Sequence, residues 1–279
     1  MIEKLTATIK LIRPVNFFIT FISVIVAAIM CQTHNIPGLN IFLAAFAASL
    51  ALASGNIVND INDVEADKIN KPFRPLPSEK ITIKQAYGLY VSSVSLSIIL
   101  SFFLNNIALI IVLFSILLLF IYSKFLKHIP LIGNITVALL TGLVFIFGGV
   151  VVNNPVAAIV PAIFALLINL IREIVKDIED ADGDNKAGVI TFPIMFGSQK
   201  SKILILVITI LLILFTSYPF LTKLYKIEYF IIVMVIVNPI LVFCVKILFE
   251  EASKKNLKRI SNLLKMSMVF GLIAIYLGV

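Results

Sequence analysis

One acidic pattern occurs twice in this sequence, with the spacing Asp-x-x-Asp-x-x-x-Asp. On an α-helix of 3.6 residues per turn, this spacing places each trio of carboxylates within an arc of about 60°. Both copies end a long apolar run, where clustered carboxylates repel one another unless a cation binds them. Hard oxygen ligands on two facing helices suit Mg²⁺, which takes its remaining ligands from water and a substrate phosphate. We therefore expect a site for a magnesium-held diphosphate at a membrane boundary. The six residues are Asp60, Asp63 and Asp67 in NDINDVEAD, and Asp177, Asp180 and Asp184 in KDIEDADGD.

Further polar residues extend both motifs backwards along the same helix faces. Polar side chains inside an apolar span are costly and usually face an internal cavity. Glu65 and Asp182 point away from these faces and are expected in solvent. A solvated helix end beside a loop is the alternative for either motif alone, and two matched motifs disfavour it. The first stripe adds Asn56 and Asn59 to the face of Asp63, and the second adds Asn169, Glu173 and Lys176 to the face of Asp180.

The composition predicts an all-α, polytopic membrane protein. The chain is 60% hydrophobic and only 14% charged, unlike an ordinary soluble domain. Apolar segments of about 20 residues span a bilayer as helices, which satisfy their own backbone groups. The polar N-terminus has no small-residue cleavage site, so no removable signal peptide is expected. Nine spans are expected, at about 14–33, 40–60, 83–104, 107–123, 131–152, 155–176, 202–220, 228–249 and 260–278.

The basic residues predict the orientation of these spans in the cell membrane. A nine-span model with the N-terminus inside places 21 of the 23 Lys and Arg residues in cytoplasmic regions, which is the positive-inside pattern. The C-terminus is then outside, and both acidic motifs lie on the cytoplasmic side. The net charge of +8 follows from this topology and from contact with anionic membrane lipid.

The chain is expected to form a single membrane domain over residues 1–279, because no linker or soluble domain interrupts it. The longer connections, at about 68–82 and 177–201, directly follow the motifs and are expected to cap the site. The two motifs are offset by 117 residues. Their similarity has two explanations, which are duplication of two helical halves and convergence on metal chemistry. The absence of a basic face on a soluble module argues against nucleic-acid binding. No feature predicts a protein partner.

These motifs and their positions resemble those of the UbiA-type membrane prenyltransferase superfamily. NDINDVEAD fits the family pattern NDxxDxxxD after the second span, and DIEDADGD fits DxxDxxxD after the sixth. The resemblance covers essentially the whole chain. It implies a bundle of helices around a central cavity that opens sideways to lipid. It also implies Mg²⁺-dependent transfer of a prenyl chain from an allylic diphosphate.

The resemblance also assigns roles to individual residues. Asn59 and the six motif aspartates would form the metal–diphosphate site. The catalytic roles would fall to Asp63, Asp180, Lys127 and Tyr122. Other matches are a basic loop position, a first-span signature and the element after the fourth span. For the basic residues among these, positive-inside anchoring is the alternative. The matching residues are Arg74 with Lys68 nearby, Arg13 and Asn16 in RPVN, Tyr122 and Lys127 in YSKFLK, and Asn56 on the polar stripe.

A narrower resemblance concerns REIVKDIEDADGD and DKINKPFRPLPS. Both are similar to the digeranylgeranylglyceryl phosphate synthases, the archaeal-type lipid enzymes. That subfamily implies transfer of a geranylgeranyl group to the free glycerol hydroxyl of geranylgeranylglyceryl phosphate, forming an ether bond and releasing diphosphate. The lipid-phosphate acceptor requires basic partners. Those available are Lys124, Lys127, Arg172 and Lys176.

Two other functions remain open from the sequence. The first is prenyl transfer to an aromatic or quinone-precursor acceptor within the same superfamily. The second is a divalent-cation carrier, which would use the acidic residues as a pathway. A carrier is expected to place ionisable residues near the midplane and on both sides of the membrane. Here they concentrate on one face, which disfavours transport.

Overall fold

The computed structural model describes residues 2–32, 37–186 and 188–279, and within these it contains helices and no strand. Eight of the described helices are long and apolar enough to cross a membrane. The predicted all-α, polytopic membrane fold is therefore confirmed, whereas the count of nine spans is not. The expected span at 155–176 is the one missing from the eight. It corresponds to α8 (Ile159–Lys186), whose apolar stretch carries the charged residues Arg172, Glu173 and Lys176.

The helix boundaries follow the expected spans closely. Apolar runs of this length satisfy their backbone groups as helices, and local caps define several ends. Thr82 and Gln85 form a reciprocal capping box that begins α5, and Asn105 caps α6. The span-length helices besides α8 are α2 (Pro14–Cys31), α3 (Gly38–Asn62), α5 (Ile83–Phe102), α6 (Asn106–Lys124), α7 (Ile132–Val151), α10 (Ser198–Leu221), Ile227–Glu250 and α13 (Lys254–Gly278).

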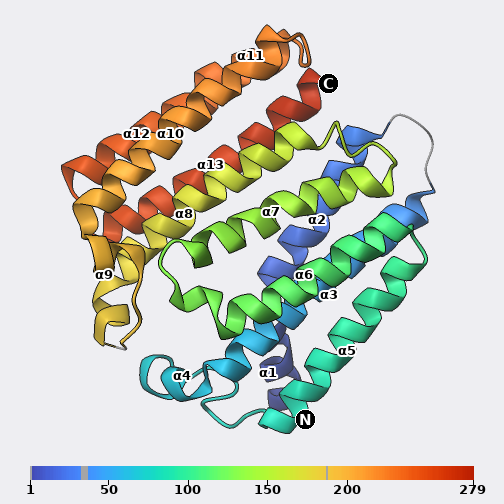
Figure 1. The fold of residues 1–279 in the computed structure, drawn as a ribbon, viewed down its shortest axis with the longest axis vertical. Helices are drawn as coiled ribbons and strands as arrows, with labels where there is room; N and C mark the ends of the chain where they lie inside the picture. Colours follow the sequence, from blue (N-terminus) through green and yellow to red (C-terminus); the bar gives the residue numbers. More distant parts are fainter. Residues whose placement is uncertain (1, 33–36, 187) are drawn as a thin grey trace. The chain divides into compact units, whose positions relative to one another are not determined.

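The chain forms two compact units. The single membrane domain expected from the sequence stays a prediction. The first unit comprises Met1–Lys127 and Leu143–Ala158. In it α3 packs against α2, α5 and α6 (Figure 1). The contact face of α3 is rich in buried alanine, which lets neighbouring backbones approach closely. At Gly148 of α7 a Cβ atom would lie only 2.6 Å from the Cβ of Ala27 on α2, so this approach requires glycine.

Short helices of the first unit connect its spans and carry part of the first motif. The amphipathic α1 (Ile2–Ile12) buries Ala7 and Leu11 in a small core with Ile57, Ile61 and Ile81. The seven-residue α4 (Val64–Asn70) continues the chain beyond α3. The 3₁₀ turn η1 (Leu126–His128) follows α6.

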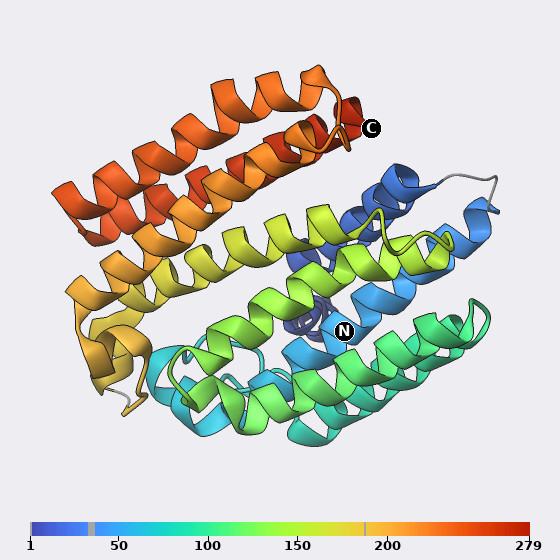
Figure 2. The ribbon, with the colours of Figure 1, turned by 45° about the horizontal axis from the view of Figure 1, so that its top comes forward.

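The second unit comprises His128–Gly142 and Ile159–Val279. Its long helix α8, yellow in Figure 2, packs against α10 and the red α13, and α13 also contacts α12. An ideal Cβ atom at Gly142 of α7 would lie only 2.8 Å from the carbonyl oxygen of Ala162 on α8, so these two helices approach closely here. The remaining elements are α9 (Phe192–Phe196), α11 (Ile227–Ile232), the π-helical η2 (Val233–Val237) and α12 (Asn238–Glu250).

Candidate active site

The first acidic motif forms an ion-pair cluster in the first unit, which we call the first half-site. Its residues are Asn59, Asp60, Asp63 and Asp67 with Arg13, Arg74 and Lys127. Asp60 lies in the last turns of α3, and its side chain is only 7% exposed. Arg13 Nη2 donates to Asp60 Oδ1 at 2.6 Å, and Arg74 Nη1 approaches the same oxygen at 3.4 Å. Two guanidinium groups therefore neutralise a nearly buried carboxylate.

Arg74 also joins the two ends of the motif. Its Nη1 donates to Asp67 Oδ2 at 2.6 Å, so one guanidinium contacts both Asp60 and Asp67. The loop that carries Arg74 packs against the protein, because Pro75 and Leu76 are buried beside it. Ser78 Oγ donates to the Arg74 carbonyl at 2.7 Å. This loop therefore holds the guanidinium over the motif.

A second contact network surrounds Asp63. Asn59 Nδ2 donates to Asp63 Oδ2 at 2.8 Å. Lys127 Nζ, from η1, donates to Asp63 Oδ1 and to Asn59 Oδ1, the latter at 3.3 Å. The Lys127 side chain is 13% exposed. Arg13 and Arg74 thus contact Asp60, Arg74 also contacts Asp67, and Lys127 contacts Asp63 and Asn59. The roles expected for these residues at a metal–diphosphate site stay predictions.

Asp63 also marks a break in the helix, which the sequence analysis did not anticipate. The α3 helix ends at Asn62, and α4 begins at Val64. Asp63 itself has φ −95° and ψ 4°. The backbone N–H of Asp67 still donates to the Asp63 carbonyl at 2.7 Å. Asp60 therefore lies on α3 and Asp67 on α4, with Asp63 at the junction, so the three carboxylates do not share one uninterrupted helix face.

The second motif lies on the continuous helix α8 and has different partners. Asp177 Oδ2 accepts a hydrogen bond from Asn134 Nδ2, on α7, at 2.8 Å. Asp180 is exposed, and Asp184 is half-buried near the end of the helix. In contrast with the first half-site, no Arg or Lys within the described residues pairs with Asp177 or Asp180. We call Asn134, Asp177, Asp180 and Asp184 the second half-site.

The basic residues next to this motif pair with one glutamate. Glu173 accepts from Arg172 Nη1 at 2.9 Å and from Lys176 Nζ at 3.4 Å. Arg172 Nη1 also donates to Asn169 Oδ1 at 3.0 Å, and Asn169 Nδ2 donates to Thr141 Oγ1 at 3.0 Å. Within the described residues, Arg172 Nε is buried with no hydrogen-bond partner. The guanidinium therefore keeps unused donors.

Several expected site residues lie outside these clusters. Lys68 is exposed and donates to Glu65 at 2.8 Å, a hydrogen bond that raises the pKa of Lys68. Lys124 is exposed, with Nζ 5.5 Å from the ring centroid of Phe125. Asn16 is exposed in the first turn of α2. Tyr122 is half-buried on α6, and Asn56 is buried and donates to the Ile12 carbonyl at 3.4 Å.

Asn134 is a site residue that the sequence analysis missed. It lies near the start of an apolar span, where an amide is costly unless it has a partner. That rule would have identified it, as it identified Asn56 and Asn169. Thr141 of the same helix accepts from Asn169 and contacts no motif aspartate among the described residues.

The fit of these residues to a divalent cation can be judged from their free oxygens. No three Asp, Glu, His or Cys side chains converge closely within the described residues. Asp60, Asp67 and Asp177 each use one carboxylate oxygen in the ion pairs and hydrogen bonds above, which leaves the second for a ligand. Hard carboxylate oxygens are the donors that Mg²⁺ prefers. The chemistry of the donor set therefore fits this metal.

Comparisons with known proteins identify the family of the chain. The model of the UbiA prenyltransferase family matches residues 20–269. The chain belongs to the UbiA prenyltransferase family. Among solved structures, that of a digeranylgeranylglyceryl phosphate synthase superposes with a TM-score of 0.82 at 35% identity, covering 99% of this chain and 98% of that one. A UbiA homologue from Archaeoglobus fulgidus bound to GPP and Mg²⁺ gives a TM-score of 0.67 at 16% identity, over 96% of this chain and 99% of the other, and supports the fold alone.

Curated relatives of this UbiA prenyltransferase match along its full length. The digeranylgeranylglyceryl phosphate synthase of Methanosphaera stadtmanae is 36% identical over 97% of this chain and 98% of its own. That of Methanocaldococcus jannaschii is 36% identical over 99% of this chain and 97% of its own. The protein is therefore an enzyme, and the cation-carrier alternative is set aside.

Proposed function

We propose that this prenyltransferase transfers a geranylgeranyl group from geranylgeranyl diphosphate to the free glycerol hydroxyl of geranylgeranylglyceryl phosphate. The reaction forms the second ether bond of an archaeal-type membrane lipid and releases diphosphate. The observation that carries this proposal is the full-length similarity to digeranylgeranylglyceryl phosphate synthases, at 36% identity for two curated relatives. The basic residues beside the second motif are compatible with an acceptor that carries a phosphate.

The residues of the first half-site would bind the donor diphosphate. Mg²⁺, when bound, would neutralise the diphosphate and assist its departure. Asn59 and the aspartates of the first motif would hold it in the first half-site, and the aspartates of the second motif would hold it in the second half-site. The cationic groups near the first motif already contact its carboxylates; these groups belong to Arg13, Arg74 and Lys127. They would exchange part of this contact for phosphate oxygens and stabilise the charge that develops on the leaving group.

The bond changes balance without a further reactant. The bond between C1 of the prenyl chain and the diphosphate oxygen breaks with its electron pair on the diphosphate. The acceptor's glycerol oxygen forms a bond to C1 and loses its proton. A carboxylate of the site or the released diphosphate would accept that proton.

Lys176 and Arg172 would bind the acceptor phosphate. Glu173 holds both cations side by side on α8, with Nη1 of Arg172 at 2.9 Å and Nζ of Lys176 at 3.4 Å. The Lys176 side chain is 42% exposed, so its ammonium group is open to a ligand. Charge-assisted hydrogen bonds to phosphate are among the stronger polar contacts. A phosphate held there would hold the acceptor beside the second motif.

The deciding experiment offers the purified enzyme geranylgeranyl diphosphate with geranylgeranylglyceryl phosphate or with 4-hydroxybenzoate, and detects products by mass. We expect the ether product, loss of activity in EDTA and recovery on adding Mg²⁺. Faster prenylation of the aromatic ring would replace this proposal with the aromatic-acceptor alternative. Full activity in EDTA would contradict the role proposed for the metal.

The active site is proposed to face the cytoplasm, with the N-terminus inside and the C-terminus outside. The support is the 21-to-2 distribution of basic residues in the nine-span model. Single cysteines at the exposed positions Phe73, Asn185 and Val156 test it in a background without Cys31 and Cys244. We expect positions 73 and 185 to be labelled from the cytoplasm and position 156 from outside. Labelling of 73 and 156 from the same side would contradict this topology.

A further inference from the structure

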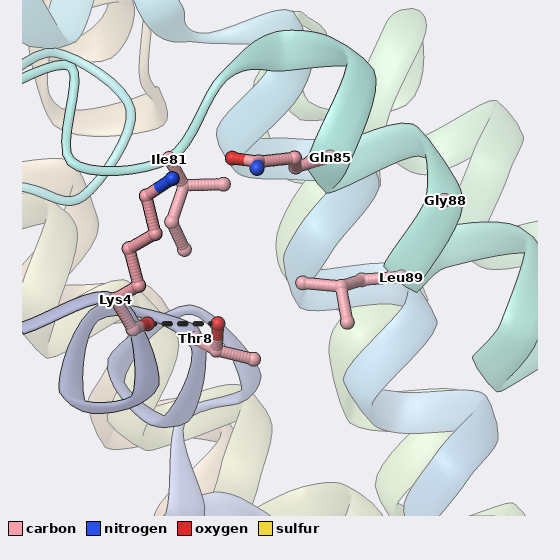
Figure 3. A pocket seen from close by; sticks show the side chains of 6 residues that line it. All are labelled: Lys4, Thr8, Ile81, Gln85, Gly88 and Leu89. Atoms are coloured by element: carbon pink, nitrogen blue, oxygen red, sulfur yellow. Dashed lines mark hydrogen bonds between the residues drawn. The ribbon is translucent and has the colours of Figure 1, made fainter. Parts of the chain in front are cut away.

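A cavity of about 320 Å³ lies between α1 and the beginning of α5, outside both half-sites (Figure 3). Both helices pack against α3, and this furrow remains between them. Lys4 extends from α1 along Ile81, while Gln85 and Leu89 point from α5 towards α1. The cavity volume is at the lower end of small-molecule sites. The lining residues are Lys4, Thr8, Ile81, Gln85, Gly88 and Leu89.

One end of this furrow is polar and positively charged. Within the described residues, Lys4 Nζ has no ion-pair or hydrogen-bond partner, since only the Lys4 carbonyl is engaged, by Thr8 Oγ1 at 2.9 Å. Gln85 Oε1 accepts from the backbone N–H of Thr82 at 3.1 Å, and its Nε2 group remains a donor. In the sequence next to the lining residues, the lysines at 4, 80 and 84 outnumber the acidic Glu3 and Glu79. An anion is therefore the favoured occupant of this end.

The other end of the furrow is apolar and lies at the start of a membrane span. Gly88 and Leu89 line it two turns into α5, which begins at Ile83. Apolar side chains next to the furrow on both helices are exposed to the surroundings. These exposed side chains are Leu5 and Ile9 of α1, and Ile83, Tyr87 and Val91 of α5. A soluble anion would contact only the polar end, whereas a lipid with an acyl or prenyl chain would contact the polar end and cover the apolar end as well.

We propose that this furrow binds an anionic phospholipid, with its phosphate at Lys4 and Gln85 and its chain along Gly88 and Leu89. An amphipathic helix beside a span lies at headgroup depth, where basic side chains attract anionic lipids. The bound lipid would tie α1 to α5 at the membrane surface. This site is separate from the diphosphate and acceptor sites proposed above, so it can fail without affecting them.

The chain offers matched variants for a test. An ideal Cβ at Gly88 meets no atom within 4 Å, so Gly88→Leu adds a side chain in the furrow without a clash at its first carbon. Gly271 of α13 is equally open, and Gly271→Leu controls for the gain in helix propensity. Lys4→Gln removes the charge at the furrow. Lys10→Gln removes the same charge from the same helix at a position that does not line it.

The purified full chain in neutral detergent is titrated with phosphatidylglycerol, phosphatidylcholine or soluble glycerol phosphate. Thermal unfolding and native mass spectrometry report binding. We expect phosphatidylglycerol alone to raise Tm and to remain bound. Lys4→Gln should weaken its apparent affinity about fivefold, as expected for one basic residue at an anionic surface, and Gly88→Leu should remove this bound lipid. Both control variants should bind as the native protein does.

Three results would overturn the proposal. Equal shifts with phosphatidylcholine would show that the charge of the headgroup is irrelevant. An equal shift with glycerol phosphate would identify a site for a soluble anion. Equal losses in Lys4→Gln and Lys10→Gln would indicate general surface electrostatics. If Gly88→Leu does not fold, the lysine pair still decides the question.

Discussion

The two acidic motifs share one spacing and differ in how their charge is balanced. In the first, Arg13, Arg74 and Lys127 neutralise Asp60, Asp67 and Asp63 from other elements of the unit. In the second, Asp177 accepts from the neutral amide of Asn134, no Lys or Arg among the described residues forms an ion pair with it, and Asp180 is exposed. The cations beside it, Arg172 and Lys176, pair with Glu173 instead. A repeated sequence motif therefore need not create a repeated electrostatic environment, and we expect the second motif to depend more on an added cation.

The largest expected effect is the loss of catalysis on removing one carboxylate from either motif. Asp63→Ala and Asp180→Ala should each lower kcat/KM about 100-fold or more, because each removes part of the charge that holds the diphosphate. The two variants should differ in stability. Asp63→Ala leaves Lys127 and Asn59 without their shared partner and should lower Tm, while Asp180→Ala removes an exposed group and should not.

Matched controls come from the same motifs. The side chains of Glu65 and Asp182 are 83% and 82% exposed, and neither residue belongs to the trio of spaced aspartates in its motif. Glu65→Ala and Asp182→Ala should change activity less than about twofold, the result expected for solvated surface charges. Near-normal turnover of Asp63→Ala or Asp180→Ala would remove that motif from the proposed mechanism.

The next effect concerns the cation that joins two carboxylates. Arg74→Gln leaves Asp60 with one guanidinium and Asp67, which is also nearly buried, with none. Loss of a partner from a buried charge should lower the free energy of unfolding by about 1–3 kcal/mol. Lys176→Gln removes a partly exposed pair and should cost less than about 1 kcal/mol.

Thermal unfolding of both variants in the same detergent measures this difference. Adding Asp67→Asn to Arg74→Gln should restore part of the loss, because the unpaired charge is then gone. Equal Tm changes for Arg74→Gln and Lys176→Gln would mean that the two regions do not differ in charge balance as described above.

The positions of the spans could be predicted from the sequence, whereas the break at Asp63 could not. The segment expected at 40–60 is α3, Gly38–Asn62, and that expected at 83–104 is α5, Ile83–Phe102. Apolar length alone determines such elements. The helix ends at Asp63 where Asn59 and Lys127 bind its carboxylate, and Lys127 is 64 residues away in sequence. Local periodicity contains no information on such a contact.

The partners of basic residues show the same limit. Arg13 and Arg74 were expected at the site, but their sharing of Asp60 depends on how α1, α2 and the loop after α4 pack on α3. Lys68 was expected nearby and instead pairs with Glu65, three residues earlier on α4. That local pair was predictable from helical spacing. The sequence identified charged residues of the site more readily than it assigned their partners.

A smaller effect is expected from Asn134, the amide that replaces a cation in the second half-site. Asn134→Ala removes the hydrogen bond to Asp177 Oδ2 and should lower activity about tenfold, the low end for residues that orient metal ligands. The Mg²⁺ concentration for half-maximal activity should rise. Thr141→Val, on the same helix, removes a bond to Asn169 and is the matched control. Equal changes in both variants, with no shift in Mg²⁺ requirement, would indicate a purely structural role for Asn134.

The smallest expected effect concerns the acceptor phosphate and distinguishes the cations of the second region from those of the first. Lys176→Met should raise the KM for geranylgeranylglyceryl phosphate about fivefold, because one exposed charge–phosphate contact is lost. The KM for geranylgeranyl diphosphate and the Mg²⁺ requirement should stay unchanged. Arg172→Met should act in the same direction, with a loss of stability as well, because its guanidinium also bonds Asn169 and Glu173. Lys127→Met, in the first half-site, should instead raise the KM for the diphosphate or lower kcat. If Lys176→Met instead raises the KM for geranylgeranyl diphosphate and leaves the KM for the acceptor unchanged, the cations of both regions bind the donor. The acceptor phosphate must then be bound elsewhere.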